Sequence, residues 1–475
     1  MTVIRRKPNR KGPNKMKFIG REQELKRLSG EISALGFRAV LIYGRRRIGK
    51  SELVKKAISD GMIPAIYYEC RQVAEESNVE GIGKVLSEKY SLPVLGYRKA
   101  DEILEYIFRM SEKNSVILVL DEYPYLRENV KGMDSILQTL IDKYRDTSHM
   151  KLILLGSYVS VMKSLLEKNN PLYGRIDLPV ELKQMDYFDS AGFYPNYSDE
   201  DKVRIYSVFG GVPYYNRLVD DRISVKENII GLVASEGARL ENEVQIYLQS
   251  EIAKMANANE VFTALANGYT KFSDILSQSH VSSGPTLIDI LNKLIKMEVV
   301  EKTAPINDPG NRKKASYSVC DNLSLFYYRY IFSHASQLGF MDAEMFYDRY
   351  IAEDFETRYV PKRFEIIARQ YLIRENRSGR IDPPFENIGK YYYDDPKSRM
   401  NGEFDVVTTD ENGYCFYEVK FRKAPVSEKM IAQEITQVQA TGMNCYRYAF
   451  ISRSGFETEE SEQIRHISLR EMYDH

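Results

Sequence analysis

The sequence is poor in cysteine and histidine, and neither residue type forms a recognisable pattern. Four cysteines (Cys70, Cys320, Cys415 and Cys445) are spread over 475 residues, and no two of them have CxxC spacing. This scarcity excludes a disulfide framework, and five dispersed histidines supply no zinc-binding pattern. We therefore expect reduced cysteines and a cytoplasmic protein.

Long apolar runs and a net charge are also missing. No stretch of about 18 apolar residues occurs, so we expect no transmembrane helix and no membrane partner. No apolar segment follows the N-terminal charges, so we expect no signal peptide. The 67 Lys+Arg and 67 Asp+Glu residues cancel, which excludes a broadly basic coat. With 43% hydrophobic residues, the composition is that of a globular chain of two to four domains of about 150 residues each.

The balanced total conceals a basic N-terminus. Residues 1–17 contain seven basic side chains and no acidic one, so the rest of the chain is mildly acidic. Its two prolines and one glycine are typical of a disordered arm. Two interpretations remain open, contact with nucleic acid phosphates or a simple effect on solubility.

Apolar runs alternate with helical patterns in the first part of the chain. Residues 38–44, 64–70, 116–122 and 151–157 are strand-like, and the stretches between them have helical spacing. This alternation predicts a doubly wound α/β domain with a parallel sheet over residues 18–195.

Three further regions follow. Residues 196–255 are helical by pattern, and residues 256–330 resemble a winged helix-turn-helix, with three helices before two strand-like runs. Residues 331–475 begin as a helical connector and continue with a strand, hairpin, strand, helix and strand. The predicted fold class is multi-domain α/β.

The segment GRRRIGKS, residues 44–51, has the G-x-x-x-x-G-K-S/T spacing of a phosphate-binding loop. A predicted strand precedes it and a predicted helix follows, the context in which backbone N–H groups cradle phosphates. Lys50 should reach the β- and γ-phosphates of ATP, and Ser51 should bind Mg²⁺. The expected nucleotide-contacting residues are Gly44, Arg45, Arg46, Arg47, Ile48, Gly49, Lys50, Ser51 and Glu52.

An acidic pair ends the most apolar predicted strand. Asp121 could hold Mg²⁺, and Glu122 could polarise the attacking water, although a helix cap is the structural alternative. Ser157, at the end of the next strand, could bind the γ-phosphate or could be a turn residue. Arg175 could stabilise charge on the transferred phosphoryl group or could form a surface ion pair.

Two motifs around the loop carry a family resemblance. FIGREQE, residues 18–24, resembles the hhGRExE signature (h, hydrophobic) of STAND-type signalling ATPases, a branch of the AAA-like P-loop NTPases. GVP, at residues 211–213, resembles their GxP motif. In that group both segments approach the nucleotide base. The resemblance, closest to the archaeal-type ATPases of this branch, implies ATP contacts for Gly20, Arg21, Gly211 and Pro213.

The predicted winged helix has two functional interpretations. Its third helix (residues 285–297) and the wing residues Arg312, Lys313 and Lys314 could contact DNA. The outward face of that helix includes Asp289, whose carboxylate is repelled by phosphates. The alternative is a lever that packs on the nucleotide domain.

Residues 403–423 form a second informative pattern. A DENG turn joins two strand-like runs, with Asp405 in the first and Glu418 and Lys420 in the second. The alternation of strand side chains places Asp405 opposite Glu418, with Lys420 beside them. Two adjacent carboxylates favour a divalent cation, and a lysine can orient water, as metal-assisted phosphodiester hydrolysis requires.

This pattern resembles the PD-(D/E)xK nuclease fold, a restriction-endonuclease-like α/β domain. Asp405 matches the aspartate of that motif and Glu418 and Lys420 its ExK, whereas Phe404 replaces the preceding proline. Glu365, in the preceding helix, matches the auxiliary carboxylate. The resemblance implies Mg²⁺ ligands at Asp405, Glu418 and Glu365, and a catalytic role for Lys420.

Together these patterns predict an ATP-hydrolysing switch coupled to a nuclease-like domain that acts on DNA, by analogy in defence or DNA processing. The alternative is a nucleotide-dependent scaffold that binds DNA or protein without cutting. The sequence leaves open whether the chain forms a homo-oligomer.

Overall fold

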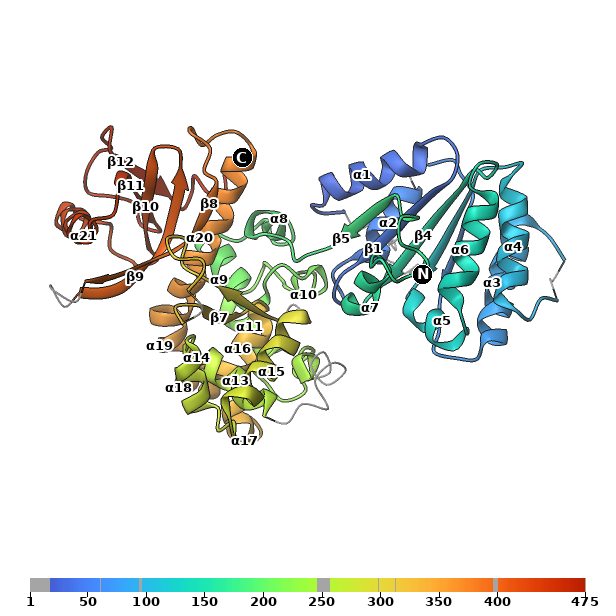
Figure 1. The fold of residues 1–475 in the computed structure, drawn as a ribbon. Helices are drawn as coiled ribbons and strands as arrows, with labels where there is room; N and C mark the ends of the chain where they lie inside the picture. The colour runs from blue at the N-terminus through green and yellow to red at the C-terminus, as the bar shows by residue number, and fades with distance from the viewer. Residues whose placement is uncertain are drawn as a thin grey trace, which may run out of the picture.

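The structure of the chain is a computed structural model. It describes residues 18–59, 61–93, 96–245, 257–297, 299–311, 313–395 and 400–474. The predicted basic arm, residues 1–17, and the wing residue Arg312 lie outside these ranges. A parallel-sheet domain lies at one end of the molecule, a C-terminal sheet at the other, and a helical region between them (Figure 1).

The N-terminal domain is built on a five-stranded sheet with the order β2-β3-β4-β1-β5 and parallel pairing throughout. Its strands are β1 (Arg38–Tyr43), β2 (Ala65–Glu69), β3 (Val116–Asp121), β4 (Met150–Gly156) and β5 (Leu178–Glu181). The four predicted strands are confirmed. The sequence pattern missed β5, because it has only four residues and includes a proline.

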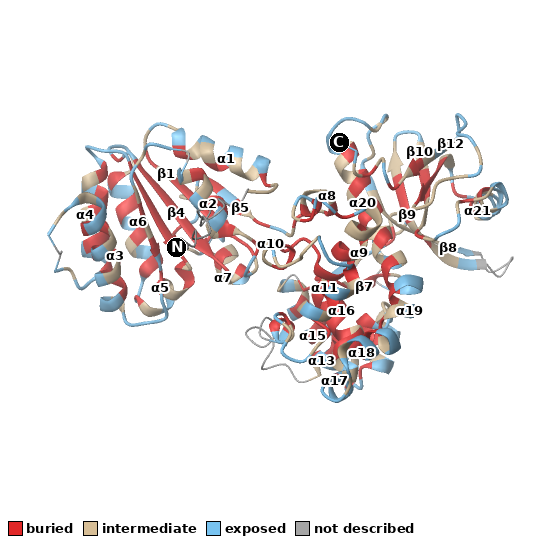
Figure 2. Cartoon of the chain, turned by 180° about the vertical axis from the view of Figure 1, so that it is seen from behind, coloured by how far each residue is buried: buried red, intermediate tan, exposed pale blue. Residues whose placement is uncertain are grey.

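Helices cover both faces of this sheet, which explains why β3 and β4 are buried along their whole length. One face packs on α1 (Glu22–Ser33) and α2 (Lys50–Ser59). The other face packs on α3 (Glu75–Tyr90), α4 (Ala100–Ser111), α5 (Tyr123–Asn129), α6 (Met133–Tyr144) and α7 (Val159–Ser164). Buried residues concentrate along these strands (Figure 2).

The helical region follows β5. It starts with α8 (Tyr187–Ala191), α9 (Asp199–Phe209), α10 (Pro213–Asn216) and α11 (Val225–Leu232). Next come α13 (Ala258–Ala266), α14 (Phe272–Gln278) and α15 (Gly284–Lys296), then an antiparallel pair of β6 (Val300–Thr303) and β7 (Ser316–Val319). Three helices and two strands thus lie where the sequence predicted them.

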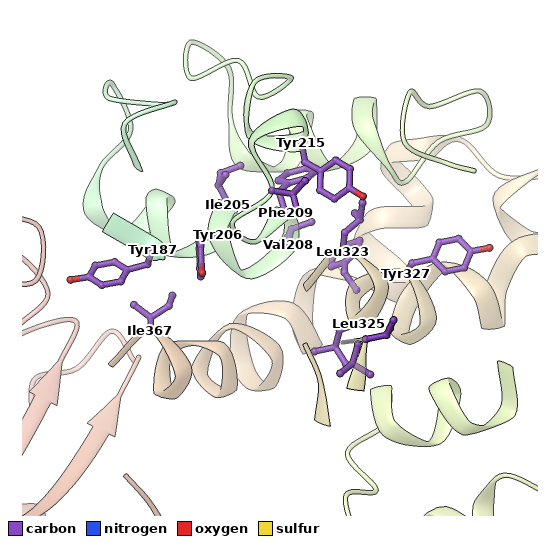
Figure 3. Close-up of a cluster of buried hydrophobic side chains, with 14 of the residues drawn as sticks. Tyr187, Ile205, Tyr206, Val208, Phe209, Tyr215, Leu323, Leu325, Tyr327 and Ile367 are labelled. Atoms are coloured by element: carbon purple, nitrogen blue, oxygen red, sulfur yellow. The ribbon is translucent and has the colours of Figure 1, made fainter. Parts of the chain in front are cut away.

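A helical connector leads from β7 to the C-terminal sheet. Its elements are α16 (Asn322–Phe326), a π-helical turn (Tyr327–Ile331), a 3-10 turn (Phe332–His334), α17 (Ala335–Leu338), α18 (Ala343–Tyr350), α19 (Ala352–Asp354), a second π-helical turn (Phe355–Tyr359) and α20 (Val360–Arg377). One buried cluster joins α8, α9, α10, α16 and α20 (Figure 3). The connector therefore shares its core with the helices that precede it.

The C-terminal domain is a mixed sheet of order β12-β11-β10-β9-β8. Its elements are β8 (Asn387–Asp395), β9 (Met400–Asp410), β10 (Gly413–Lys420), α21 (Glu428–Ala440), β11 (Cys445–Ser452) and β12 (Ile464–Ser468). Strands β8, β9 and β10 pair antiparallel, and β10, β11 and β12 pair parallel. Helix α20 packs on one face and α21 on the other. Among the described helices, none has the length and apolar character to cross a membrane.

Candidate functional site

The predicted phosphate loop lies between β1 and α2, at the carboxyl end of the parallel sheet. Two glycines let it fold tightly. Gly44 has φ 152°, and a Cβ there would lie 2.3 Å from the Leu182 carbonyl oxygen, so only glycine fits. Gly49 has φ 95° and leads into the first turn of α2, whose N-terminus favours anions.

Lys50 is the first residue of α2 and is only 5% exposed. Its ammonium group donates to three neutral oxygens, Ser157 Oγ at 2.8 Å, the Gly44 carbonyl at 2.9 Å and the Arg45 carbonyl at 3.1 Å. Burial lowers the pKa of Lys50 to about 8, against the opposing effect of nearby Glu122 and Asp121. An anionic ligand would therefore stabilise the charged form of Lys50.

Asp121 ends β3 beside the loop. The Ser51 hydroxyl donates to Asp121 Oδ2 at 2.7 Å, and the Tyr67 hydroxyl donates to the same oxygen. Burial, with Asp121 adding to it, raises the pKa of Tyr67. Ser51 and Asp121 thus supply adjacent hard oxygen atoms of the kind Mg²⁺ prefers, so these residues fit the ion.

Glu122 adopts a left-handed backbone, φ 51° and ψ 46°, which is strained for a residue with a side chain. Its carboxylate accepts hydrogen bonds from the backbone N–H of Ser157, at 3.1 Å, and from the Ser157 hydroxyl. Because Lys50 also contacts that hydroxyl, Ser157 bridges the lysine and the glutamate. The predicted acidic pair therefore flanks the predicted phosphate position.

A cavity of about 910 Å³ opens over the loop. This is within the usual range for ligand pockets, about 300–1,000 Å³. Its lining combines residues of the sheet domain with Pro213, Tyr214 and Glu243 of the helical region. The predicted site residues that line it are Arg21, Arg46, Arg47, Ile48, Gly49, Lys50, Ser51, Glu52, Glu122, Ser157 and Pro213.

Two glycines of the family signatures lie outside the lining of the cavity. Gly20 has φ 62°, and a Cβ there would approach the Asp189 carboxylate to 3.0 Å. A Cβ on Gly211 would lie 1.8 Å from the Met185 carbonyl oxygen, because Met185 N donates to the Gly211 carbonyl at 2.9 Å. Both positions permit close packing around the linker after β5. The nucleotide contacts that we expected for these two glycines stay predictions.

The loop arginines connect to the helical region. Arg45 pairs with Asp321 at 2.7 Å and donates to the Tyr215 hydroxyl at 3.2 Å. Arg47 pairs with Glu243 and lies 4.2 Å from the ring centroid of Tyr214. Arg45 does not line the cavity and its guanidinium is paired with Asp321, so its expected nucleotide contact stays a prediction.

Arg175 requires a correction. It precedes β5, and therefore lies at the amino end of the sheet, whereas the phosphate loop follows the carboxyl end of β1. Its guanidinium binds both Asp142 oxygens at 2.7 Å. This position supports the surface ion pair and not the role in phosphoryl transfer.

The second predicted cluster assembles on the C-terminal sheet. Tyr417 pairs with Val406 in the β9–β10 ladder, so the next position brings Glu418 opposite Asp405. Lys420 contacts Glu418, and it lies 3.5 Å from Glu434 of α21. The turn between β9 and β10 is the predicted hairpin.

Burial changes the pKa of the acidic groups in this cluster. It raises the pKa of Glu418 to about 7, although Lys420 opposes the shift. It also raises the pKa of Glu365, and the charge of Asp405 adds to that rise. For Asp405 burial is outweighed, because Lys390 and Lys362 lower the pKa of its carboxyl.

Two lysines form ion pairs with Asp405, one of the carboxylates that we expected to bind a metal ion. Lys362 of α20 lies 3.1 Å from both Asp405 oxygens and 2.8 Å from Glu365, and Lys390 of β8 lies 3.0 Å from Asp405. Across the described ranges, no three His, Cys, Asp or Glu residues are arranged to hold a metal ion. In this arrangement the cluster does not fit Mg²⁺.

Several of these partners were not among the residues predicted from the sequence. Lys362 precedes Glu365 by three residues on one helix, a spacing that could have identified it. Lys390 had no such signal, because β8 was not recognised as a strand. Asp321 and Glu243 lie far from the loop in sequence, and only the folded chain brings them to it.

Comparisons with known proteins agree with the N-terminal geometry. Residues 18–219 match a family described as an ATPase domain predominantly from Archaea. Residues 327–435 match a family described as archaeal and bacterial proteins of unknown function. An uncharacterised protein of Methanocaldococcus jannaschii is 28% identical over 413 residues, covering 85% of this chain and 88% of its own length.

Solved structures resemble part of the chain. A Walker-type ATPase of Pyrococcus abyssi is 19% identical, with TM-score 0.48, and the match covers 66% of this chain and 96% of that one. The ORC2 protein of Aeropyrum pernix, in ADPNP and ADP complexes, is 14% identical, with TM-score 0.47, over 67% of this chain and 94% of that one. Both scores are below 0.5, so the assignment depends on the family match and the loop geometry. Residues 18–219 contain a P-loop ATPase domain.

Proposed function

We propose that the protein is an ATP-hydrolysing switch that controls a C-terminal domain acting on DNA. One observation carries this proposal. The phosphate loop faces a nucleotide-sized cavity through Lys50 and Ser51, while its Arg45 reaches across to Asp321 in the helical region. The same eight-residue loop can therefore bind phosphate and transmit the event to another part of the chain.

Each residue at the loop has a role in this proposal. Lys50 binds the β- and γ-phosphate oxygens, and Ser51 and Asp121 hold Mg²⁺, which when bound neutralises charge on the phosphates. Glu122 accepts the proton of the attacking water. Two hydrogen bonds from Ser157, one to each carboxylate oxygen, hold Glu122 in place for this role.

The loop arginines provide the proposed coupling. A bound triphosphate brings negative charge close to the guanidinium groups of Arg45 and Arg47 and competes with Asp321 and Glu243 for them. Asp321 is almost fully buried, so weakening its ion pair has a substantial energetic effect on the helical region. ATP binding and hydrolysis would thereby shift α16 and the β6–β7 unit.

The C-terminal half of the proposal concerns DNA. Asp405, Glu418 and Lys420 are the residue types of a PD-(D/E)xK nuclease, and they lie on the neighbouring interior strands β9 and β10, where Lys420 contacts Glu418. One observation favours a second function, binding without cleavage: two lysines already neutralise Asp405. For the winged-helix-like unit we favour a packing role over direct DNA contact, because the wing residue Lys314 lies over the Tyr392 ring of β8. This contact is with the C-terminal sheet, whereas the predicted lever packs on the nucleotide domain.

ATP turnover and plasmid cleavage, measured together, test this proposal. We expect ATP hydrolysis that Glu122→Gln reduces strongly, and Mg²⁺- or Mn²⁺-dependent DNA cleavage that changes among ATP, no nucleotide and a non-hydrolysable analogue. Wild-type turnover by Glu122→Gln would remove that residue as the base. Cleavage that persists in Asp405→Ala would remove the nuclease assignment.

A further inference from the structure

The loop between β6 and β7 is docked on the edge strand of the C-terminal sheet. Ile306 N donates to the Lys390 carbonyl at 2.8 Å. The Asn307 side chain donates to the Tyr392 carbonyl at 2.7 Å and accepts from Tyr392 N at 3.1 Å. The loop therefore lies along the outer edge of β8, held by one backbone and two side-chain hydrogen bonds.

Side chains reinforce this docking. The Lys314 ammonium lies 4.0 Å from the centroid of the Tyr392 ring, a cation–π distance. Gly389 allows the approach, since a Cβ there would lie 2.7 Å from Ile306 Cγ2 and the isoleucine would have to shift. Backbone, ring and glycine contacts thus fix the same stretch of β8.

The docked strand carries one of the lysines on Asp405. Lys390 lies 3.0 Å from Asp405 and 2.5 Å from Glu403. Glu403 also pairs, at 3.3 Å, with Lys271, which immediately precedes α14 of the helical region. A chain of alternating charges therefore runs from the helical region to the carboxylate of the candidate site.

We propose that Lys390 is a positioning residue that caps Asp405 against divalent cations, and that the docked β6–β7 loop holds this cap in place. The inference depends on the proposed function in one respect, that the C-terminal cluster is a metal site when open. Lys362 and Lys390 supply two positive charges at hydrogen-bonding distance from Asp405, so an approaching cation meets repulsion and must displace an ammonium group.

The same region connects the cap to the nucleotide. Asp321 comes two residues after β7 and pairs with Arg45 of the phosphate loop. Displacement of the β6–β7 unit by nucleotide would pull on the three hydrogen bonds to β8. On this route the part of the cap formed by Lys390 opens when the ATPase domain changes state.

Mn²⁺ binding to the full-length protein without nucleotide tests the cap, with free Mn²⁺ measured by electron paramagnetic resonance. We expect Lys390→Gln to bind Mn²⁺ at least about tenfold more tightly than the wild type does. The double variant with Asp405→Asn should lose this gain in affinity. Lys390→Arg keeps the charge and should keep the wild-type affinity. Equal affinity of Lys390→Gln and wild type would overturn the cap.

The loop has a matched pair of variants. Asn307→Ala removes both side-chain hydrogen bonds to β8, whereas Asn311→Ala removes contacts only to Asp308 and Lys313 of the same loop. We expect faster amide exchange in residues 390–394 and about threefold tighter Mn²⁺ binding for Asn307→Ala alone. Faster exchange without tighter Mn²⁺ binding would refute the role of the loop.

Plasmid cleavage separates this inference from the proposed function. If Lys390→Gln gains Asp405-dependent Mn²⁺ binding but cuts no DNA, the cap stands and the nuclease assignment fails. If the wild type cuts DNA through Asp405 while Lys390→Gln binds Mn²⁺ no more tightly, the nuclease stands and the cap fails.

Discussion

The phosphate loop and the C-terminal cluster both place lysine near carboxylates that are at least partly buried, but they satisfy the charges differently. Among the described residues, Lys50 forms no ion pair and donates only to neutral oxygens, next to a cavity of about 910 Å³. Asp405 instead contacts two ammonium groups. The first site gains stabilising contacts when an anion binds, whereas the second must lose contacts before a cation can bind.

The largest expected effect is at Lys50. Lys50→Met should reduce ATP turnover about 100-fold or more, because it removes a charge that contacts the transferred phosphoryl group. It should not lower the free energy of unfolding, since burial already disfavours the charged lysine. Steady-state kinetics and urea unfolding test both parts. Lys55→Met is the matched control, because Lys55 lines the same cavity but is 57% exposed.

Asp405 should behave in the opposite way. Asp405→Asn should lower the free energy of unfolding by about 1–3 kcal/mol, because each lysine on it loses a charged partner. ATP turnover should be unchanged. Urea unfolding of the C-terminal transition checks this, with the exposed β8 residue Asp394→Asn as control. Equal stability of the two variants would mean that Asp405 is not held by its lysines.

The pKa of Lys50 predicts a pH dependence of nucleotide affinity. Below a pH of about 8 the lysine is protonated in the free protein, so it adds no pH dependence to the nucleotide affinity. Above that value it loses its proton and must regain it to bind phosphate, so the dissociation constant for ATP should rise about tenfold per pH unit. Lys50→Arg should remove this slope, because guanidinium stays charged. Titrations from pH 7 to 10 test it, and a slope retained by Lys50→Arg would assign the dependence to another group.

The smallest expected effect is at Arg175. Arg175→Gln should change ATP turnover by no more than about twofold, since the side chain forms an exposed ion pair with Asp142. An arginine that stabilised the transition state would contribute about 1,000-fold or more. A loss of that size would show that Arg175 takes part in phosphoryl transfer.

Local patterns were enough to identify the P-loop ATPase domain. Strands β1 to β4 are apolar runs, and the spacing of the glycines, Lys50 and Ser51 in the loop by itself indicates phosphate binding. Both signals are contained in short stretches of sequence and do not depend on distant residues. The partners of the loop do depend on them, because Asp321 lies 276 residues from Arg45. The predicted C-terminal cluster was incomplete for the same reason. The alternation of side chains along the strands places Asp405 near Glu418, but it does not predict Lys390 or the β6–β7 loop that docks on β8.

The shared core of α9, α10, α16 and α20 has a consequence for how this chain can be divided (Figure 3). A fragment that begins at residue 331 would carry Tyr359 and Ile367 without the α9 and α16 residues that help to bury them, and we expect it to aggregate. Recombination between relatives faces the same limit. An exchanged C-terminal domain would have to bring with it the helices on which α20 packs.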